Sequence, residues 1–104
     1  MKVRFEPIIK VEVLRSSELQ LVLASGGSET YQHVYREARG VYWDNEVGAF
    51  RGTDRKSWSY AEWFAHIVEV CGSIGIRLQI SDDTTWQDVP DPDKERILDM
   101  EALK

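Results

Sequence analysis

Two stretches near the start of the chain alternate apolar with polar residues. Over residues 9–13 and 19–23 every second residue is aliphatic, and a polar run at residues 15–18 separates the two stretches. Alternation with a period of two is typical of a strand that buries one face. The pattern predicts a β-hairpin.

A helix and a second hairpin are expected next. After a Ser-Gly-Gly-Ser break, apolar residues recur at helical spacing, and Gly40 follows them. This spacing predicts an amphipathic helix over residues 29–38. Residues 41–43 and 47–51 are rich in strand formers and flank the turn formers Asp44-Asn45-Glu46, which predicts the hairpin.

The clearest local signal is the start of a central helix. Ser59 and Glu62 have the spacing of a capping box, in which each side chain satisfies a free backbone N–H of the other residue. Trp58 and Trp63 stand where two residues of a hydrophobic staple pack together. A wide apolar stripe follows, so a helix is predicted over residues 60–73.

A short strand and a last helix complete the pattern. Residues 76–80 alternate, and Ser81-Asp82-Asp83 is expected to end the strand and to cap a brief turn that holds Trp86. Asp91-Pro92 matches an N-cap followed by a proline at the first helical position. The helix that it opens carries three apolar residues, Ile97, Leu98 and Met100.

These elements predict a single α+β domain over residues 1–104. Their order is β-β-α-β-β-α-β-α, and no repeat or long linker divides the chain. Each hairpin needs a covered face, so we expect a mostly antiparallel or mixed five-stranded sheet with helices packed on one face.

Composition and charge narrow the classes of partner. The chain has 42% hydrophobic and 30% charged residues, as globular proteins do, and its net charge of -5 arises in residues 82–104, which carry eight acidic and three basic residues. It contains no basic run, so nucleic acid is not an expected partner. No apolar stretch has the length of a signal peptide or a membrane span. A lone cysteine, Cys71, favours a reducing compartment, and we expect a cytoplasmic protein.

Metal and cofactor sites are not predicted. One cysteine and two histidines cannot form a closed zinc site. Glu62, His66 and Glu69 share one helical face, which we interpret as a solvated polar face with ion pairs rather than as an open cation site. Cys71 belongs to the apolar stripe of the central helix, so we expect a buried core thiol and no nucleophile.

Two segments could carry chemistry. Asp82 and Asp83 follow a predicted strand, where carboxylates serve catalysis or Mg²⁺ binding, although the same residues also form good turns. Gly26, Gly27 and Ser28 lie between a strand and a helix N-terminus, a position suited to anions. They match no known phosphate-binding loop, and a plain turn with Ser28 as N-cap is the other reading.

The aromatic residues point to binding. Trp43 and Trp86 lie beside turns, where they serve either as interface anchors or as cover for a small core. Tyr42, Trp43 and Phe50 belong to a hairpin with few of the lysines and prolines that protect a sheet edge, so we expect self-association there. Alternatively, Trp43 packs on the first helix through Tyr31 or Tyr35 and leaves a monomer.

Three segments carry a resemblance to a known group. VYWDNEVGAFRGT, WFAHIVEVCGSIGIRL and DDTTWQDVP resemble parts of the small proteins of bacterial mobile gene cassettes, the integron cassette proteins. The resemblance spans about residues 28–100. It implies a compact bacterial accessory protein that often self-associates, and that group has no common catalytic residue to carry over.

The sequence therefore favours a non-enzymatic binding module that forms homo-oligomers or binds another protein. A first alternative is a small enzyme that uses Asp82 and Asp83. A second is an acidic inhibitor or immunity-type protein that covers a basic partner surface with the C-terminal quarter of the chain. The sequence does not indicate which small molecule, if any, is bound.

Overall fold

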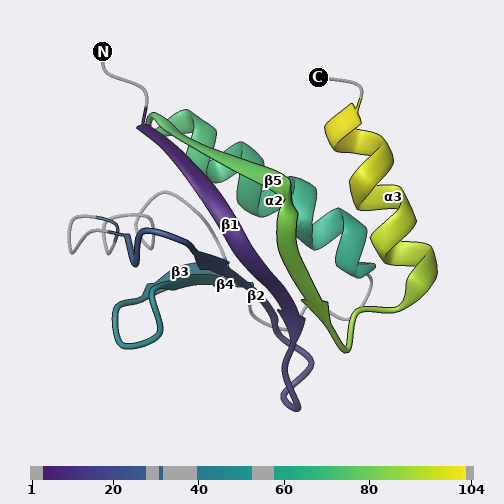
Figure 1. Ribbon diagram of the computed structural model, residues 1–104. Helices are drawn as coiled ribbons and strands as arrows, with labels where there is room; N and C mark the ends of the chain where they lie inside the picture. Colours follow the sequence, from purple (N-terminus) through teal and green to yellow (C-terminus); the bar gives the residue numbers. More distant parts are fainter. Residues whose placement is uncertain (1–3, 28–30, 32–39, 53–57, 103–104) are drawn as a thin grey trace.

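A computed structural model describes residues 4–27, 31, 40–52 and 58–102 of the chain (Figure 1). Over these residues the chain forms five strands and two helices in the order β-β-β-β-α-β-α. The α+β class and the five-stranded mixed sheet predicted from the sequence are confirmed. Apart from Tyr31, the helix expected over residues 29–38 lies outside the described residues.

Both predicted hairpins are present. β1 (Arg4–Val13) pairs antiparallel with β2 (Leu19–Leu23), and β3 (Val41–Asp44) pairs antiparallel with β4 (Ala49–Gly52). In the turn of the second hairpin, Asp44 Oδ1 accepts the backbone N–H groups of the two residues that follow Asn45. Val11, Leu19, Leu21 and Leu23 fill the core, as their alternation predicts. The prediction is wrong for Ile9, which is 46% exposed, because the register shifts between Ile8 and Lys10 and Ile8 is the buried residue instead.

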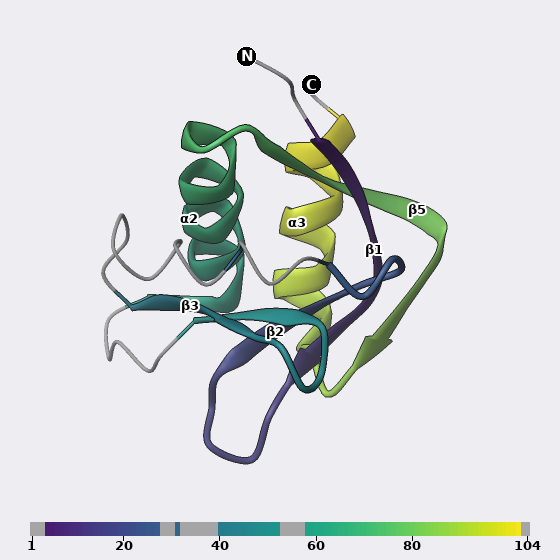
Figure 2. The same ribbon diagram turned by 90° about the vertical axis from the view of Figure 1, so that its left-hand side faces the viewer.

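The strands form one sheet in the order β3-β4-β2-β1-β5. β1 pairs in parallel with β5 (Ile76–Gln87), whereas the other neighbours are antiparallel. The sheet curves around the two helices, which lie together on its concave side (Figure 2). β3 and β5 are therefore the two edge strands.

The central helix, α2 (Tyr60–Ser73), begins where the sequence predicts. Ser59 Oγ accepts the N–H of Glu62 at 3.2 Å, and the carboxylate of Glu62 accepts the N–H of Ser59 at 3.1 Å, so the capping box is complete. The rings of Trp58 and Trp63 form the staple, with centroids 4.9 Å apart. The buried face of α2 covers the sheet.

The last helix, α3 (Asp91–Ala102), packs against α2. Ile97 is fully buried in the shared core, whereas Leu98 is 40% exposed. Asp93 Oδ1 accepts the N–H of Ala61 at 3.3 Å, so a carboxylate of α3 satisfies a free N–H in the first turn of α2.

The expected end of the fifth strand is wrong. β5 does not stop at Ile80 but continues to Gln87, and Trp86 pairs with Val11 of β1. Between the pairs Ile8↔Ile80 and Lys10↔Thr85 the register shifts, because four residues of β5 lie opposite one residue of β1. The segment that looked like a turn is a bulge inside a longer strand.

No helix in the described part of the chain is long and apolar enough to cross a membrane.

Candidate functional site

One hollow of the described surface is a groove along β5. Its volume is about 940 Å³, and it lies between the edge strand and α2. Two positions of α2, Val68 and Gly72, form one wall, Pro7 of β1 contributes from the sheet, and residues 76–81 of β5 form the rest. A smaller hollow of about 200 Å³, which includes Phe5, adjoins it at Gly72, Ile76 and Arg77.

The groove combines apolar and polar side chains. On β5 the buried or half-buried residues Ile76, Leu78 and Ile80 alternate with the exposed Arg77 and Gln79. The first three share the face of the sheet that the helices cover, because they pair with the helix-facing side of β1. A ligand in the groove would meet aliphatic side chains on one side and polar side chains on the other.

The backbone of β5 is open on the groove side. Arg4 donates its N–H to the carbonyl of Gly75 at 2.7 Å, which fixes the direction of the backbone groups in this parallel pair. Since the direction alternates along a strand, Arg77 and Gln79 point their backbone groups at β1, and Leu78 and Ile80 point theirs outward. No strand in the described part of the chain pairs with that outer side. An extended segment could therefore add to the sheet here.

Gly72 lies where a side chain would have no close neighbour in the described part of the chain. It lies in the last turn of α2, and a Cβ atom built there would meet nothing within 4 Å among the described atoms. A glycine inside a helix is less stable than alanine by about 0.5–1 kcal/mol. What the missing side chain provides is room in the groove, which Gly72 lines.

The bulge of β5 carries the two carboxylates predicted as catalytic candidates. Asp82 and Asp83 are exposed, and they lie at the end of the groove beside Ser81. The bulge is held by Thr84, whose buried hydroxyl donates to the carbonyl of Ile8 at 2.6 Å and accepts the N–H of Ser81 at 3.0 Å. The structure therefore gives the carboxylates a rigid base and brings no other described acid, histidine or cysteine into a metal-binding group with them.

The predicted binding residues of the second hairpin separate into two groups. Trp43 is 6% exposed and Phe50 is fully buried. They pack with Tyr31, at centroid distances of 5.2 Å from Tyr31 to Trp43 and 4.8 Å from Trp43 to Phe50. This is the monomer arrangement that was the alternative for Trp43, so neither ring lies on the described surface.

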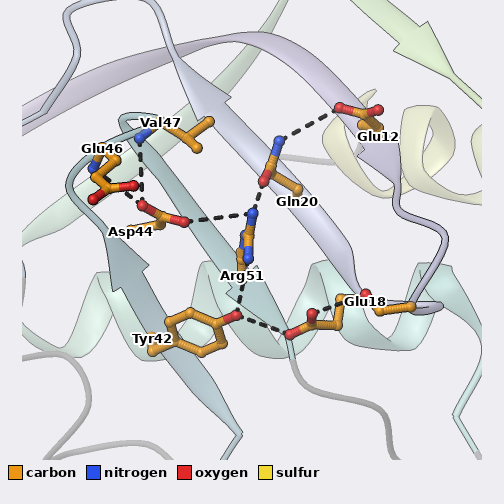
Figure 3. Close-up of polar contacts among 9 residues, drawn as sticks. Glu12, Glu18, Gln20, Tyr42, Asp44, Glu46, Val47 and Arg51 are labelled. Atoms are coloured by element: carbon orange, nitrogen blue, oxygen red, sulfur yellow. Dashed lines mark hydrogen bonds and ion pairs between the residues drawn. The ribbon is translucent and has the colours of Figure 1, made fainter.

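Tyr42 lies on the opposite, helix-free face of the sheet, in a polar network around Arg51 (Figure 3). The guanidinium donates to Gln20 at 2.9 Å and to Tyr42 at 3.3 Å, and it pairs with Asp44 at 3.4 Å. Tyr42 donates to Glu18 at 2.9 Å. The hydrogen bond with Tyr42 is the main cause of the raised pKa of Arg51. These side chains hydrogen-bond and pair with one another across the outer face of β2, β3 and β4, and we interpret the network as structural.

One of the two glycines proposed as an anion site, Gly27, makes room for Trp43. Gly27 has a φ of +74°, and a Cβ on it would lie 2.2 Å from Cη2 of the Trp43 ring. Its N–H is donated to Ser25 Oγ at 3.1 Å. Gly26 is exposed with a φ of +78°, and Ser28 lies outside the described residues. Anion binding by Gly26, Gly27 and Ser28 stays a prediction, and the structure gives Gly27 a packing role.

Trp86 occupies a different surface. It is half-buried near the end of β5, and the ammonium of Lys94 lies 5.4 Å from its ring centroid. This cation–π contact ties β5 to α3. Neither the groove nor the smaller hollow beside it is lined by Trp43, Trp86 or Asp82.

A buried carboxylate on β1 was not expected from the alternation of residues. Glu6 is 4% exposed and accepts hydrogen bonds from the hydroxyls of Tyr31 and Ser25, the second at 2.7 Å. Burial and this carboxylate raise the pKa of Tyr31 to about 12. The guanidinium of Arg4 lies 5.3 Å from the centroid of the Tyr31 ring. The carboxylate of Glu6 is buried and hydrogen-bonded to two hydroxyls, so we interpret this cluster as stabilising the fold.

The polar face of α2 is solvated at its two glutamates. Glu62 and Glu69 are exposed, and His66 is half-buried against Trp58, with ring centroids 5.0 Å apart. Cys71 is fully buried, and burial raises the pKa of its thiol to about 12. The prediction of a core thiol is confirmed.

The fold and groove thus define a small α+β protein whose sheet has an open edge strand. A scan of protein-family models and a search of curated proteins found no match. Among solved structures, the chain matches the integron cassette protein Hfx_Cass5 from the mobile metagenome of the North West Arm sewage outfall, at 23% identity and a TM-score of 0.40 over 93% of this chain and 95% of that one. The matched structure is an integron cassette protein, the group that the sequence resembles. At this identity and TM-score it carries no information on a ligand or partner.

Proposed function

We propose that the chain is a non-enzymatic protein-interaction module that self-associates, and that its contact surface is the edge of β5 with the adjoining groove. One observation carries the proposal: a long edge strand with outward backbone groups borders a groove of about 940 Å³ that reaches α2. An extended segment in that groove gains backbone hydrogen bonds along β5 and burial of its side chains against Val68 and Ile80.

Three features of the groove support a protein ligand. Residues 76–87 contain no lysine or proline, two residues that commonly keep other strands away from a sheet edge. Phe5 is 57% exposed and lies in the hollow that adjoins the groove, so a partner strand would cover a large apolar side chain. Because Gly72 has no side chain, α2 does not narrow the groove at this position, and a Cβ atom there would meet no described atom within 4 Å.

The proposal moves the contact from the second hairpin to the opposite edge of the sheet. Trp43 and Phe50, the expected anchors, are core residues in the described chain, and Tyr42 is engaged with Glu18 and Arg51. The argument for self-association through a poorly protected edge is unchanged, but the strand that fits it is β5.

Light scattering coupled to size exclusion at micromolar concentration tests the proposal. The wild-type mass should exceed that of one chain, and Gly72→Gln, which places a long side chain in the groove, should reduce it to one chain. Ala65→Gln is the matched control, because Ala65 is an exposed position of the same helix that does not line the groove. A wild-type mass of one chain, or equal effects of the two variants, refutes the proposal.

A further inference from the structure

We infer that the segment that adds to β5 is β5 of a second copy, in antiparallel orientation about a two-fold axis. This inference rests on the proposed function and deepens it, because it names the partner and the geometry of the contact. It follows from the distribution of charge along the open edge of the strand.

The groove segment of β5 is charged at its two ends with opposite sign. Arg77 is exposed near the start of the strand, and Asp82 and Asp83 are exposed on the bulge at the far end of the groove. Between them, residues 78–81 carry no charge. A parallel partner would place like charges opposite each other, which destabilises a strand pair. An antiparallel second copy places each arginine near the aspartates of the other chain.

The backbone geometry is compatible with this pairing. With the two-fold axis at Gln79, Arg77 of one copy lies opposite Ser81 of the other, one residue from Asp82. With the axis at Ile80, Arg77 lies opposite Asp83 itself. With the axis at Gln79, the outward backbone groups of Leu78 face those of Ile80 in the second copy, and with the axis at Ile80 the two Ile80 residues face each other. Both registers are possible because hydrogen-bonded residues face one another in an antiparallel pair.

The surroundings of the strand also favour a second copy. A two-fold axis on β5 places α2 of each copy beside β5 of the other copy. Because Gly72 has no side chain, the two chains can approach closely at this position of α2. Each copy also places its exposed Phe5 ring beside one end of the strand pair. Because the interface is isologous, it uses both β5 edges and closes at a dimer.

A charge-swap experiment tests the inference. One variant carries Arg77→Glu, and the other carries Asp82→Arg with Asp83→Arg. In each variant the groove segment has a single sign of charge, so its homodimer dissociation constant, measured by analytical ultracentrifugation, should rise at least about tenfold. An equimolar mixture should restore dimers of wild-type affinity, since the two variants complement each other in an antiparallel pair.

Matched controls are charge reversals on the exposed side of α3. Arg96→Glu and Asp99→Arg change the net charge in the same directions at exposed positions outside the groove, and both should dimerise like the wild type. Recovery in the mixture also shows that the variants are folded.

The outcomes separate the inference from the proposed function. A monomeric wild type refutes both. A wild-type dimer whose affinity ignores the Arg77 and Asp82/Asp83 reversals, or a mixture no tighter than either variant alone, refutes the antiparallel β5 pairing and leaves self-association through another part of the surface.

Discussion

A pair of glycine-to-alanine substitutions should have opposite effects on stability. Gly52 of β4 and Gly72 of α2 differ in what an added methyl group meets. At Gly52 a Cβ atom would lie 2.6 Å from Cε3 and 3.0 Å from Cζ3 of the Trp63 ring. At Gly72 it would meet nothing within 4 Å among the described atoms.

The cost at Gly52 follows from how firmly Trp63 is held. Its side chain is 3% exposed and packs against Trp58 and His66, at centroid distances of 4.9 Å and 5.9 Å. The ring cannot retreat without moving these neighbours, and overpacking of this kind typically costs about 1–3 kcal/mol. At Gly72 the helix gains the propensity difference between alanine and glycine, about 0.5–1 kcal/mol.

Urea unfolding followed by far-ultraviolet circular dichroism measures both effects. The protein should be kept at a fixed sub-micromolar concentration, so that self-association adds little to the free energy of unfolding. Gly52→Ala should lower the midpoint and Gly72→Ala should raise it, both without a change in slope. For a domain of this size, 1 kcal/mol corresponds to a shift of roughly 4 °C in the thermal midpoint. A neutral Gly52→Ala would refute the close contact between β4 and α2 as the reason for this glycine.

Three further predictions concern α2. Ser59→Ala should lower the free energy of unfolding by about 1 kcal/mol, because it removes one half of the capping box; an unchanged urea midpoint would mean that the cap does not support the helix. Zn²⁺ or Ni²⁺ should raise the thermal midpoint no more than a weak surface chelate does, and a saturable rise of several degrees that disappears in His66→Ala would contradict this. The pKa of the Cys71 thiol is raised to about 12, above its value in the unfolded chain, so the stability that it contributes is complete below about pH 8.5 and is lost as the pH rises toward 12. Urea titrations between pH 8 and 11 should therefore show a shallower decline for Cys71→Ala than for the wild type, and equal slopes would contradict the burial of the thiol.

Elements whose signals are local could be predicted from the sequence. The bounds of α2 match the prediction, because the capping box, the staple and the apolar stripe all lie within residues 58–73. Both hairpins were found for a similar reason, since alternation and turn formers are adjacent in the chain. Cys71 was correctly placed in the core from its position in the stripe of α2.

Features that depend on distant contacts were missed. Ser81-Asp82-Asp83 has the composition of a turn, but pairing with β1 resumes beyond the bulge, and the hydroxyl of Thr84 bridges to Ile8, a residue far away in the sequence. The bulge is thus fixed by a tertiary contact that overrides local propensity.

The burial of Trp43 and the presence of the groove could not be predicted either, because both depend on contacts between residues that are distant in the sequence. Trp43 stands beside a turn, and its ring is buried by Tyr31, by Phe50 and by the close approach of Gly27, all distant in the sequence or on another strand. The groove depends on the position of β5 at the edge of the sheet, and the order of strands cannot be read from alternation alone.

The parallel pair of β1 and β5 also determines when the sheet can be completed. Arg4 pairs with Ile76, so the first strand finds its last neighbour only after most of the chain has been made. The antiparallel strands β1 to β4 can pair as soon as residue 52 is available, and until β5 arrives one side of β1 is open. The pairing of β1 with β5 closes the long loop between these two strands, and it is slow because the conformational entropy of the loop is lost before the strand contacts form. In a ribosome-bound or truncated chain that lacks β5, the backbone groups on one side of β1 are unpaired. We expect such fragments to aggregate through β1.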